Sequence, residues 1–394
     1  MLNKKESPAK IGFLIPSMTW GGAELQLINA LALFGQQGYD TYLMVTGTQL
    51  ELLDRTNLPP HKILCLKNEN LNFLTSKSIY PSVSTAWRII CYLRQHNVRI
   101  LIAQLPLSHW IARWATVFSW AALFPIKILL YHHSEQFSAN PAITGEMKVF
   151  NKVNMILGFL CDHTHIFISN SSYVDFKKNQ FVRNPHIIHN FTKETVVSDQ
   201  QARIYLAAKG KSTFDQLLVV PGRLHTVKGQ MFFLNAMDIY LTKEKMKEGN
   251  ILFVFAGGGP AQEAIQKKLE DMGIANFSLI TGFIENELLL SFLKLSSLVI
   301  IPSLFEGLGN VAIESLMLRC KILCSDAGGL KEVIGTSQAA VVFKAGHAKD
   351  LQNKLKSILN GQAIFDPESG YQWYQNNFTP EIHLGKWRAI LEKM

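Results

Sequence analysis

Short apolar runs alternate with helical segments along the whole 394-residue chain, and this alternation constrains the fold more than any other feature. The runs are continuous instead of alternating in polarity, which is typical of parallel strands buried on both faces. We expect strands at residues 10–16, 39–45, 62–66, 98–103, 126–131, 165–168, 187–190, 217–222, 251–256, 277–281, 297–302 and 339–343. The repeated strand–helix order predicts two α/β domains, each built on a parallel sheet.

The composition describes a globular protein with large cores. Hydrophobic residues make up 48% of the chain and charged residues 18%, which excludes a disordered protein. The formal charge is +9, and residues 1–190 hold seventeen Lys and Arg against ten Asp and Glu. The basic excess therefore lies in the first half, and we expect no nucleic-acid partner.

The sequence favours a cytoplasmic location. The N-terminal residues are polar and lack the apolar core of a signal peptide, and the longest apolar run, residues 114–126, is too short to span a membrane. The five cysteines form no C-x-x-C pair, which is typical of buried thiols in a reducing compartment.

Residues 303–314 join an apolar strand to an apolar helix through a glycine-containing turn. Such a junction aims backbone N–H groups and a helix N-terminus at an anion. Glu306 and Glu314 lie at either end of it, and carboxylates at a site for phosphate are best explained as acceptors for sugar or ribose hydroxyls. The spacing of the two acids alone would favour an ordinary strand–helix turn with its acids in solvent, since such pairs occur by chance.

A second junction, at residues 221–229, carries two cations. Arg223 follows a strand and Lys228 precedes a helix, and a planar guanidinium beside a point charge suits a diphosphate. Near the N-terminus, Gly21 and Gly22 form a turn that lets the backbone approach a ligand closely. His132 and His133 end the strand at 126–131, where parallel sheets place chemistry. Packing alone would also explain either histidine.

Several of these motifs occur together in one family. E-G-L-G-N-V-A-I-E at 306–314, G-R-x4-K-G at 222–229 and G-G-A-E at 21–24 resemble motifs of the retaining glycosyltransferases of family 4 (glycosyl transferases group 1). The resemblance covers nearly the whole chain, and its motifs are more specific in the second half. It implies the GT-B fold, with two Rossmann-like domains facing across a cleft.

By this resemblance, residues 1–191 form the acceptor domain, 192–370 the nucleotide-sugar domain, and 371–394 a helix that returns to the first domain. The resemblance implies transfer of a hexosyl or N-acetylhexosaminyl group from a nucleotide-diphosphate sugar, UDP-linked for preference, to a glycan or lipid-linked acceptor, with retention of configuration. The pathway expected is surface polysaccharide synthesis. A non-catalytic nucleotide-sugar-binding protein on the same fold is the alternative. A closer enzymatic rival is a phosphorylase, which needs a Lys-bound pyridoxal phosphate in a much longer chain.

The resemblance also assigns roles to single residues. The catalytic group would comprise Arg223, Lys228, Glu306 and a histidine, for which we favour His132 over His133. The donor-binding set would be Gly21, Gly22, Arg223, Lys228, Gly282, Phe283, Ile284, Glu306, Leu308, Gly309, Asn310 and Glu314. Because the chain has no D-x-D motif, we expect neither a metal nor a cofactor, and the two cations must stabilise the leaving diphosphate.

A cluster of tryptophans near basic residues raises the question of a membrane. Trp110, Trp114 and Trp120 lie near Arg113 and Lys127 in the basic half of the chain. Tryptophans and cations of this kind can hold a protein at an anionic membrane surface. The alternative is that the tryptophans belong to the core, and the sequence favours neither.

Overall fold

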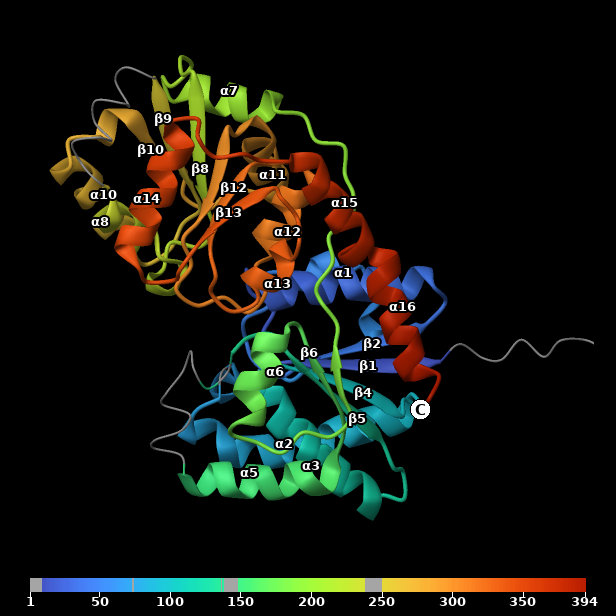
Figure 1. Cartoon of the computed structure of the whole chain (residues 1–394). Coiled ribbons are helices and arrows are strands. Elements are labelled where there is room, and N and C mark those ends of the chain that lie inside the picture. The colour runs from blue at the N-terminus through green and yellow to red at the C-terminus, as the bar shows by residue number, and fades with distance from the viewer. Residues whose placement is uncertain (1–8, 73, 136, 138–147, 238–249) are drawn as a thin grey trace, which may run out of the picture. The chain divides into compact units, whose positions relative to one another are not determined.

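The computed structural model describes residues 9–72, 74–135, 137, 148–237 and 250–394 (Figure 1). The chain divides into two compact units. Unit 1 comprises residues 1–190 with 383–394, and unit 2 comprises residues 191–382. Both units consist of a sheet with helices on its faces, and every strand pairing is parallel.

Unit 1 contains a 7-stranded sheet with the strand order β3-β2-β1-β4-β5-β6-β7. Its strands are β1 (Lys10–Ile15), β2 (Asp40–Val45), β3 (Ile63–Cys65), β4 (Ile100–Gln104), β5 (Lys127–His132), β6 (Asp162–Phe167) and β7 (Pro185–Ile187). Its helices are α1 (Gly22–Gln36), α2 (Ile79–Gln95), α3 (Leu105–Ala121), α5 (Lys148–Cys161) and α6 (Asn170–Lys177), with α16 (Pro380–Leu391) at the end of the chain. Short 3-10 helices are η1 (Leu53–Thr56), η2 (Pro60–Lys62), η3 (Glu69–Leu71) and η4 (Ser76–Ser78).

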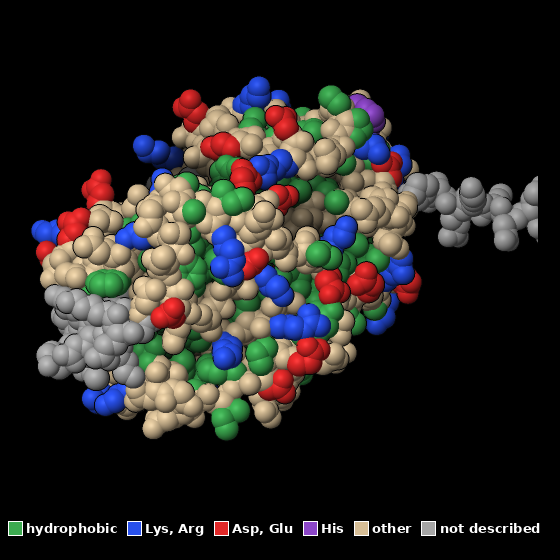
Figure 2. All heavy atoms as spheres, turned by 90° about the horizontal axis from the view of Figure 1, so that it is seen from above, with side chains coloured by type: hydrophobic (Ala, Val, Ile, Leu, Met, Phe, Trp, Pro, Cys, Tyr) green, Lys and Arg blue, Asp and Glu red, His purple; other side chains and the backbone are tan. Residues whose placement is uncertain are grey.

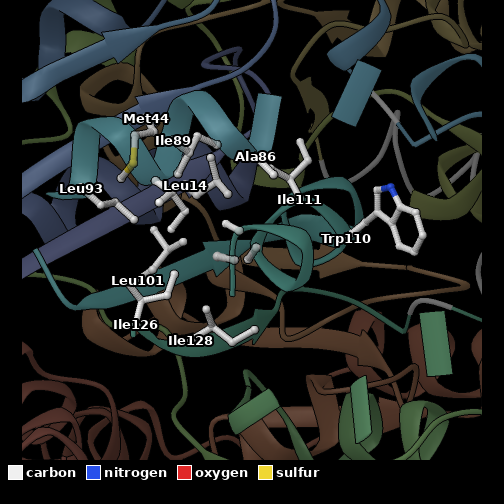
Figure 3. Close-up of a cluster of buried hydrophobic side chains, with 14 of the residues drawn as sticks. Leu14, Met44, Ala86, Ile89, Leu93, Leu101, Trp110, Ile111, Ile126 and Ile128 are labelled. Carbon is white, nitrogen blue, oxygen red and sulfur yellow. The ribbon is translucent and has the colours of Figure 1, made fainter. Parts of the chain in front are cut away.

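Helices α2, α3 and α5 pack on one face of this sheet (Figure 1). Figure 3 shows part of the resulting core, in which Leu14, Met44 and Leu101 from the strands meet Ile89 of α2 and Ile111 of α3. All five side chains are fully buried. Continuous burial of this kind explains why the strand sequences are uniformly apolar.

A second core lies where α1 meets the C-terminal helix. The Trp387 ring of α16 lies edge-on to Phe34 of α1 and to Tyr131 of β5, with centroids 5.7 Å apart in both pairs. Phe13 of β1 completes the contact at 5.8 Å from Phe34. Edge-to-face contacts between fully buried rings add to the energy of burial, so the last turns of the chain are an integral part of unit 1.

Unit 2 contains a 6-stranded sheet with the order β10-β9-β8-β11-β12-β13. Its strands are β8 (Gln216–Pro221), β9 (Ile251–Ala256), β10 (Ser278–Ile280), β11 (Leu298–Ile301), β12 (Ile322–Ser325) and β13 (Ala340–Phe343). Its helices are α7 (Gln200–Ala208), α8 (Gln230–Ala236), α10 (Gln262–Asp271), α11 (Asn286–Leu295), α12 (Asn310–Met317), α13 (Leu330–Ile334), α14 (Ala348–Leu359) and α15 (Pro367–Asn377), with the 3-10 helices η5 (Thr226–Lys228) and η6 (Ala275–Phe277).

The structure corrects the single helix expected at 371–394. The segment forms two helices, because Pro380 has no backbone N–H to continue the first one. Helix α15 belongs to unit 2, where the Tyr374 hydroxyl donates to the Thr192 carbonyl at 2.8 Å, and only residues from His383 onward join unit 1. Helices α5 and α7 were not anticipated from the sequence.

Candidate functional site

The candidate site lies at the carboxyl ends of the strands of unit 2. Strand β8 comes first in the chain and lies beside β11, so the strand order reverses between them. Ligands of open parallel sheets bind at such a reversal, just beyond the strand ends. The loops that follow β8, β9, β10, β11 and β12 all emerge at this edge and contain the residues singled out in the sequence.

The loop after β8 presents two cations to this edge. Arg223 is exposed, and its guanidinium has no hydrogen bond or ion pair within the described part of the chain. Gln230 of α8 donates to the Arg223 carbonyl at 3.1 Å, which fixes the backbone beneath the side chain. Lys228 ends the 3-10 turn η5, and Gly229 (φ 70°) then starts α8.

Lys228 forms an ion pair with Glu306 across the β8–β11 junction. Lys228 Nζ lies 2.9 Å from Glu306 Oε1 and 2.7 Å from Oε2. Ser303 Oγ donates to Glu306 Oε2 at 3.0 Å, and Ser325 Oγ donates to the Ser303 carbonyl at 2.6 Å. The Glu306 side chain is only 12% exposed, so the carboxylate is held in one orientation by three neighbouring strand ends. Neither serine was assigned a role from the sequence, although Ser303 follows β11 and Ser325 is the last residue of β12.

Backbone contacts hold the two loops together. The N–H of Leu304 donates to the Val227 carbonyl at 2.8 Å. Any Cβ at Gly229 would come within 1.9 Å of the Pro302 carbonyl oxygen, so only glycine allows this approach. The close packing sets the distance between Lys228 and Glu306.

The loop after β9 packs against the same turn. Leu224 N–H donates to the Gly258 carbonyl at 2.9 Å, and a Cβ at Gly257 would meet the Gly222 carbonyl oxygen at 2.2 Å. On its other side, Gly258 lies against Phe283, whose backbone N and ring would crowd a Cβ at 2.9 and 2.7 Å. The Phe283 ring is 74% exposed. Gly282 precedes it with φ 71°, and Ile284 is partly buried.

Helix α12 starts beside Glu306. Its N-cap is Gly309 (φ 98°), where a Cβ would meet Leu330 Cδ2 at 2.5 Å, and Asn310 is its first residue. Leu308 is buried and anchors the turn. The N-terminal N–H groups of the helix thus face the edge that carries Arg223 and Lys228, as an anion site requires.

Glu314, one turn into α12, has a strongly shifted pKa. Its carboxylate forms no ion pair or side-chain hydrogen bond within the described residues, and desolvation by the surrounding protein raises its pKa to about 7. A desolvated carboxyl without a partner is a costly arrangement. It is best explained by hydroxyl donors that a ligand supplies.

In unit 1, His132 and His133 at the end of β5 differ in their packing. The His132 side chain is 3% exposed, stacks on Phe167 with centroids 4.5 Å apart, and has Nε2 3.2 Å from His165 Nδ1. Burial holds the pKa of His132 well below its usual value and lowers the pKa of His133 to about 3. Because successive side chains of a strand point to opposite faces, His133 lies on the other side. Its Nε2 is 3.0 Å from Gln104 Oε1, and it is only partly buried.

Gly21 and Gly22 lie at the start of α1. Gly21 is the N-cap and Gly22 the first helical residue. Glu24 in the same turn is buried and accepts a hydrogen bond from Thr19 Oγ1 at 3.3 Å, and burial raises its pKa. Beside this turn the Trp20 ring is half exposed and lies under the Arg55 guanidinium at 4.5 Å.

The structure places most of the tryptophan cluster in the core, one of the two alternatives that the sequence left open. Trp110 and Arg113 of α3 are 3% and 2% exposed, and Arg113 forms a buried ion pair with Asp162, with Nη2 2.6 Å from Oδ2. Trp114 packs against the core, and Lys127 contacts the Met394 carbonyl oxygen. Only Trp120, 45% exposed, reaches the surface substantially.

The described residues contain no cluster of three or more His, Cys, Asp or Glu side chains placed to hold a metal ion. No helix among them is both long and apolar enough to cross a bilayer.

Comparisons with known proteins point to one class. Residues 203–377 match the family model described as glycosyl transferases group 1. Among solved structures, sucrose-phosphate synthase from Thermosynechococcus elongatus superposes with a TM-score of 0.76 at 16% identity, covering 98% of this chain and 100% of that one. HepE from Anabaena, solved with UDP and glucose, gives 0.74 at 16% identity, with 98% and 100% coverage. The two units therefore have the GT-B fold.

Sequence relatives extend the similarity over most of the chain. The 2-deoxystreptamine N-acetyl-D-glucosaminyltransferase of Niallia circulans is 25% identical over 87% of this chain and 90% of its own length. An N-acetyl-D-galactosaminyltransferase of Campylobacter jejuni is 28% identical over 90% and 89%. The match with the alpha-D-kanosaminyltransferase of Streptomyces kanamyceticus, at 27% identity, spans only 39% of this chain and 37% of that protein. Together these matches show that both units of the chain are similar to glycosyltransferases.

Proposed function

We propose that this chain is a retaining glycosyltransferase that moves a hexosyl or N-acetylhexosaminyl group from a UDP-linked sugar to a glycan or lipid-linked acceptor. The observation that carries the proposal is the Lys228–Glu306 pair, which combines a phosphate-type cation and a hydroxyl acceptor at the strand reversal of unit 2. We further propose a cytoplasmic enzyme of surface polysaccharide synthesis, acting at the inner face of the membrane. The name of the Campylobacter relative describes an undecaprenol-linked acceptor, which favours this pathway.

In the proposed complex, the ion pair between Lys228 and Glu306 breaks, and each side chain binds the donor instead. A partly exposed ion pair contributes only about 1 kcal/mol, so a diphosphate with several charges can replace Glu306 as the partner of Lys228. The exposed Arg223, in the loop just after β8, would bind the second phosphate through two hydrogen bonds from its guanidinium. Glu306 would then accept from hydroxyls of the transferred sugar, next to the backbone amides of Leu308, Gly309 and Asn310.

The rest of the nucleotide would lie along the neighbouring loops. Glu314 would accept the ribose hydroxyls, which explains its lack of a partner. The base would rest on the loop of Gly282, Phe283 and Ile284, where the exposed aromatic ring offers a stacking surface. We propose that the two cations, without a divalent metal, stabilise the charge that develops on the leaving diphosphate.

The acceptor would bind to unit 1. Gly21 and Gly22 at the start of α1 offer backbone amides, and we propose His133, in place of the buried His132, as the catalytic histidine of this unit. No carboxylate is an evident covalent nucleophile, so retention would follow from attack on the same face through an ion-pair intermediate.

Release of nucleoside diphosphate from a panel of UDP-, GDP- and ADP-linked hexoses and N-acetylhexosamines tests this function. We expect release of nucleoside diphosphate from at least one donor. We also expect NMR to show that the new glycosidic bond has the same anomeric configuration, axial or equatorial, as the bond in the donor. Inversion would contradict retention. Tight binding of a nucleotide sugar without release, even with lipid extracts and glycans as acceptors, would favour the alternative, a non-catalytic binding protein.

A further inference from the structure

Helix α5 (Lys148–Cys161) exposes an apolar face that the proposed function does not use. Five hydrophobic side chains between residues 153 and 160 point outward and are 39% to 58% exposed: Val153, Met155, Ile156, Phe159 and Leu160. Together with Lys152 they occupy one side of the helix, since they recur at spacings of three and four residues. We refer to these five residues as the α5 apolar face. Surface helices of globular proteins are normally polar on this side.

The opposite side of α5 is packed, so the exposed face is not the result of a loosely placed helix. Phe150, Leu157 and Cys161 are buried in the core of unit 1. Arg113 of α3 donates from Nη1 to Asn154, and its guanidinium passes under Gly158, where a Cβ would lie 3.2 Å from Nη2. The buried Arg113–Asp162 pair therefore supports the helix from beneath and fixes which face points outward.

The neighbouring helices of the same layer carry further exposed aromatic groups. Helices α2, α3 and α5 cover one face of the sheet, and their outer sides point away from it (Figure 1). Trp87 of α2 lies edge-on to Phe118 of α3 at 5.9 Å, and with Tyr80 they line a groove of about 230 Å³. Trp120 and Leu123 are 45% and 90% exposed at the end of α3.

The segment that forms this layer is predominantly basic. Residues 70–190 contain eleven Lys and Arg but four Asp and Glu, with no acid at all from 70 to 134. Of the three acids that are described, Asp162 and Asp175 are buried and Glu135 accepts a hydrogen bond from Ser171. By contrast, basic and acidic side chains are interspersed on the face that Figure 2 shows.

Basic groups directly border the α5 apolar face. Lys152 lies on the same side of helix α5, next to Val153 and Ile156, and is exposed. The Arg183 guanidinium lies over the rings of Phe159 and Phe181, at 5.7 and 5.6 Å from their centroids, and the two rings are 5.3 Å apart. Lys177 and Lys178 follow at the end of α6 and are exposed.

We propose that the α5 apolar face, with Lys152 and Arg183, docks unit 1 onto an anionic lipid bilayer. Apolar side chains of a surface helix enter the boundary between headgroups and acyl chains while flanking cations attract anionic lipid. A protein partner would be expected to leave some acidic or mixed charges at the rim, and no exposed acid borders this face among the described residues. The inference names the surface by which the proposed enzyme would reach a membrane acceptor. Its test measures lipid binding alone, so it can fail while the transferase activity stands.

Co-sedimentation of the full chain with vesicles tests the surface. Vesicles of phosphatidylglycerol and phosphatidylcholine in equal parts are compared with phosphatidylcholine alone. We expect binding to the anionic vesicles that weakens with added salt. Ile156→Glu combined with Phe159→Glu should lower the partition coefficient at least about tenfold, and Lys152→Glu, a change of an already exposed side chain, should lower it several-fold.

Ile364→Glu is the matched control, because Ile364 is 90% exposed in unit 2 and should leave vesicle binding unchanged. Circular dichroism and thermal unfolding establish that each variant is folded. Wild-type protein that stays in the supernatant with anionic vesicles would overturn the proposal, as would equal losses in the Ile156/Phe159 variant and the control. A dimer in ultracentrifugation that the Ile156/Phe159 variant dissociates would assign the face to a second copy of the chain instead.

Discussion

Lys228 and Glu306 neutralise each other in the ligand-free structure, with Nζ 2.9 and 2.7 Å from the two carboxylate oxygens. The ion pair joins loops that follow two adjacent strands, β8 and β11, and Ser303 holds the carboxylate from the other side. The site thus keeps both groups in position before any donor arrives. Such preorganisation lowers the cost of ordering side chains when the ligand binds.

The first prediction concerns the cations. Arg223→Ala and Lys228→Ala should each reduce turnover by roughly a hundredfold or more, the scale for removing a preorganised group that stabilises developing charge. Lys349→Ala, which removes an exposed lysine of α14, should have no effect. Nucleoside diphosphate release measures all three. Treatment with EDTA should leave the wild-type rate intact, and a reversible loss would show that a metal is required.

The second prediction concerns pH and Glu314. Because burial raises the pKa of Glu314 from its ordinary value of 4.5 to about 7, the folded state binds a proton that the unfolded chain releases. Stability from this group is therefore present below about pH 4.5 and lost as the pH rises through about 7. Glu314→Gln should be more stable than wild type at pH 8, by an amount on the order of 2 kcal/mol, and the advantage should vanish at pH 4. Denaturant unfolding at both pH values measures the difference, and a constant difference would contradict the shift.

The same ionisation should appear in ligand binding. Ribose hydroxyls donate best to an ionised carboxylate, so UDP affinity in the wild type should increase as the pH rises through about 7, the pKa of Glu314. Glu314→Gln serves as the control because it keeps the titration of UDP itself. Parallel pH profiles for the two proteins would remove Glu314 from the ribose site.

The third prediction concerns the contact between the loops. Gly229 and Gly361 have nearly the same φ, 70° and 71°, but a Cβ at Gly229 meets the Pro302 oxygen at 1.9 Å whereas Gly361 faces open space. Gly361→Ala should cost about 1 kcal/mol from the left-handed backbone alone. Gly229→Ala should lower the free energy of unfolding by at least about 1 kcal/mol more and reduce turnover, because the loops must separate. Equal costs in the two variants would mean that the loops can separate freely.

The fourth prediction separates the two histidines. His133→Ala should lower turnover while leaving thermal unfolding nearly unchanged, since the side chain is only partly buried. His132→Ala should lower the unfolding temperature instead, because it leaves a cavity beside Phe167 and Phe176. Loss of turnover in a folded His132 variant, with a fully active His133 variant, would restore the original preference.

The sequence predicted most of the fold because buried parallel strands are recorded as continuous apolar runs, such as the strand that became β9 (Ile251–Ala256), whose six residues are all buried. It also singled out Arg223, Lys228, Glu306 and Glu314 as candidates, because each follows a strand or a glycine turn. The sequence did not predict which face of a strand a given side chain would occupy. His132 and His133 differ by one position on a strand, and only the packing against Phe167 decides that His132 points inward.

Helices α3 and α5 are a second case in which the sequence did not predict which side chains would be buried. Trp110 and Arg113 resembled a membrane-facing stripe, but α5 covers them, and that helix was not expected from its sequence. Apolar residues occur on both sides of α5, so periodicity alone gave no clear signal. The pairing of Lys228 with Glu306 likewise depends on a contact between residues 78 positions apart.

Calorimetry with two ligands tests most directly the claim that the two acids divide the donor between them. UDP alone and the intact UDP-sugar that supports turnover are titrated into wild type, Glu306→Ala and Glu314→Ala. We expect Glu314→Ala to weaken both ligands. Glu306→Ala should bind UDP at least as well as wild type, since it frees Lys228, yet lose affinity for the intact donor. Equal losses for both ligands in both variants would contradict the proposed site.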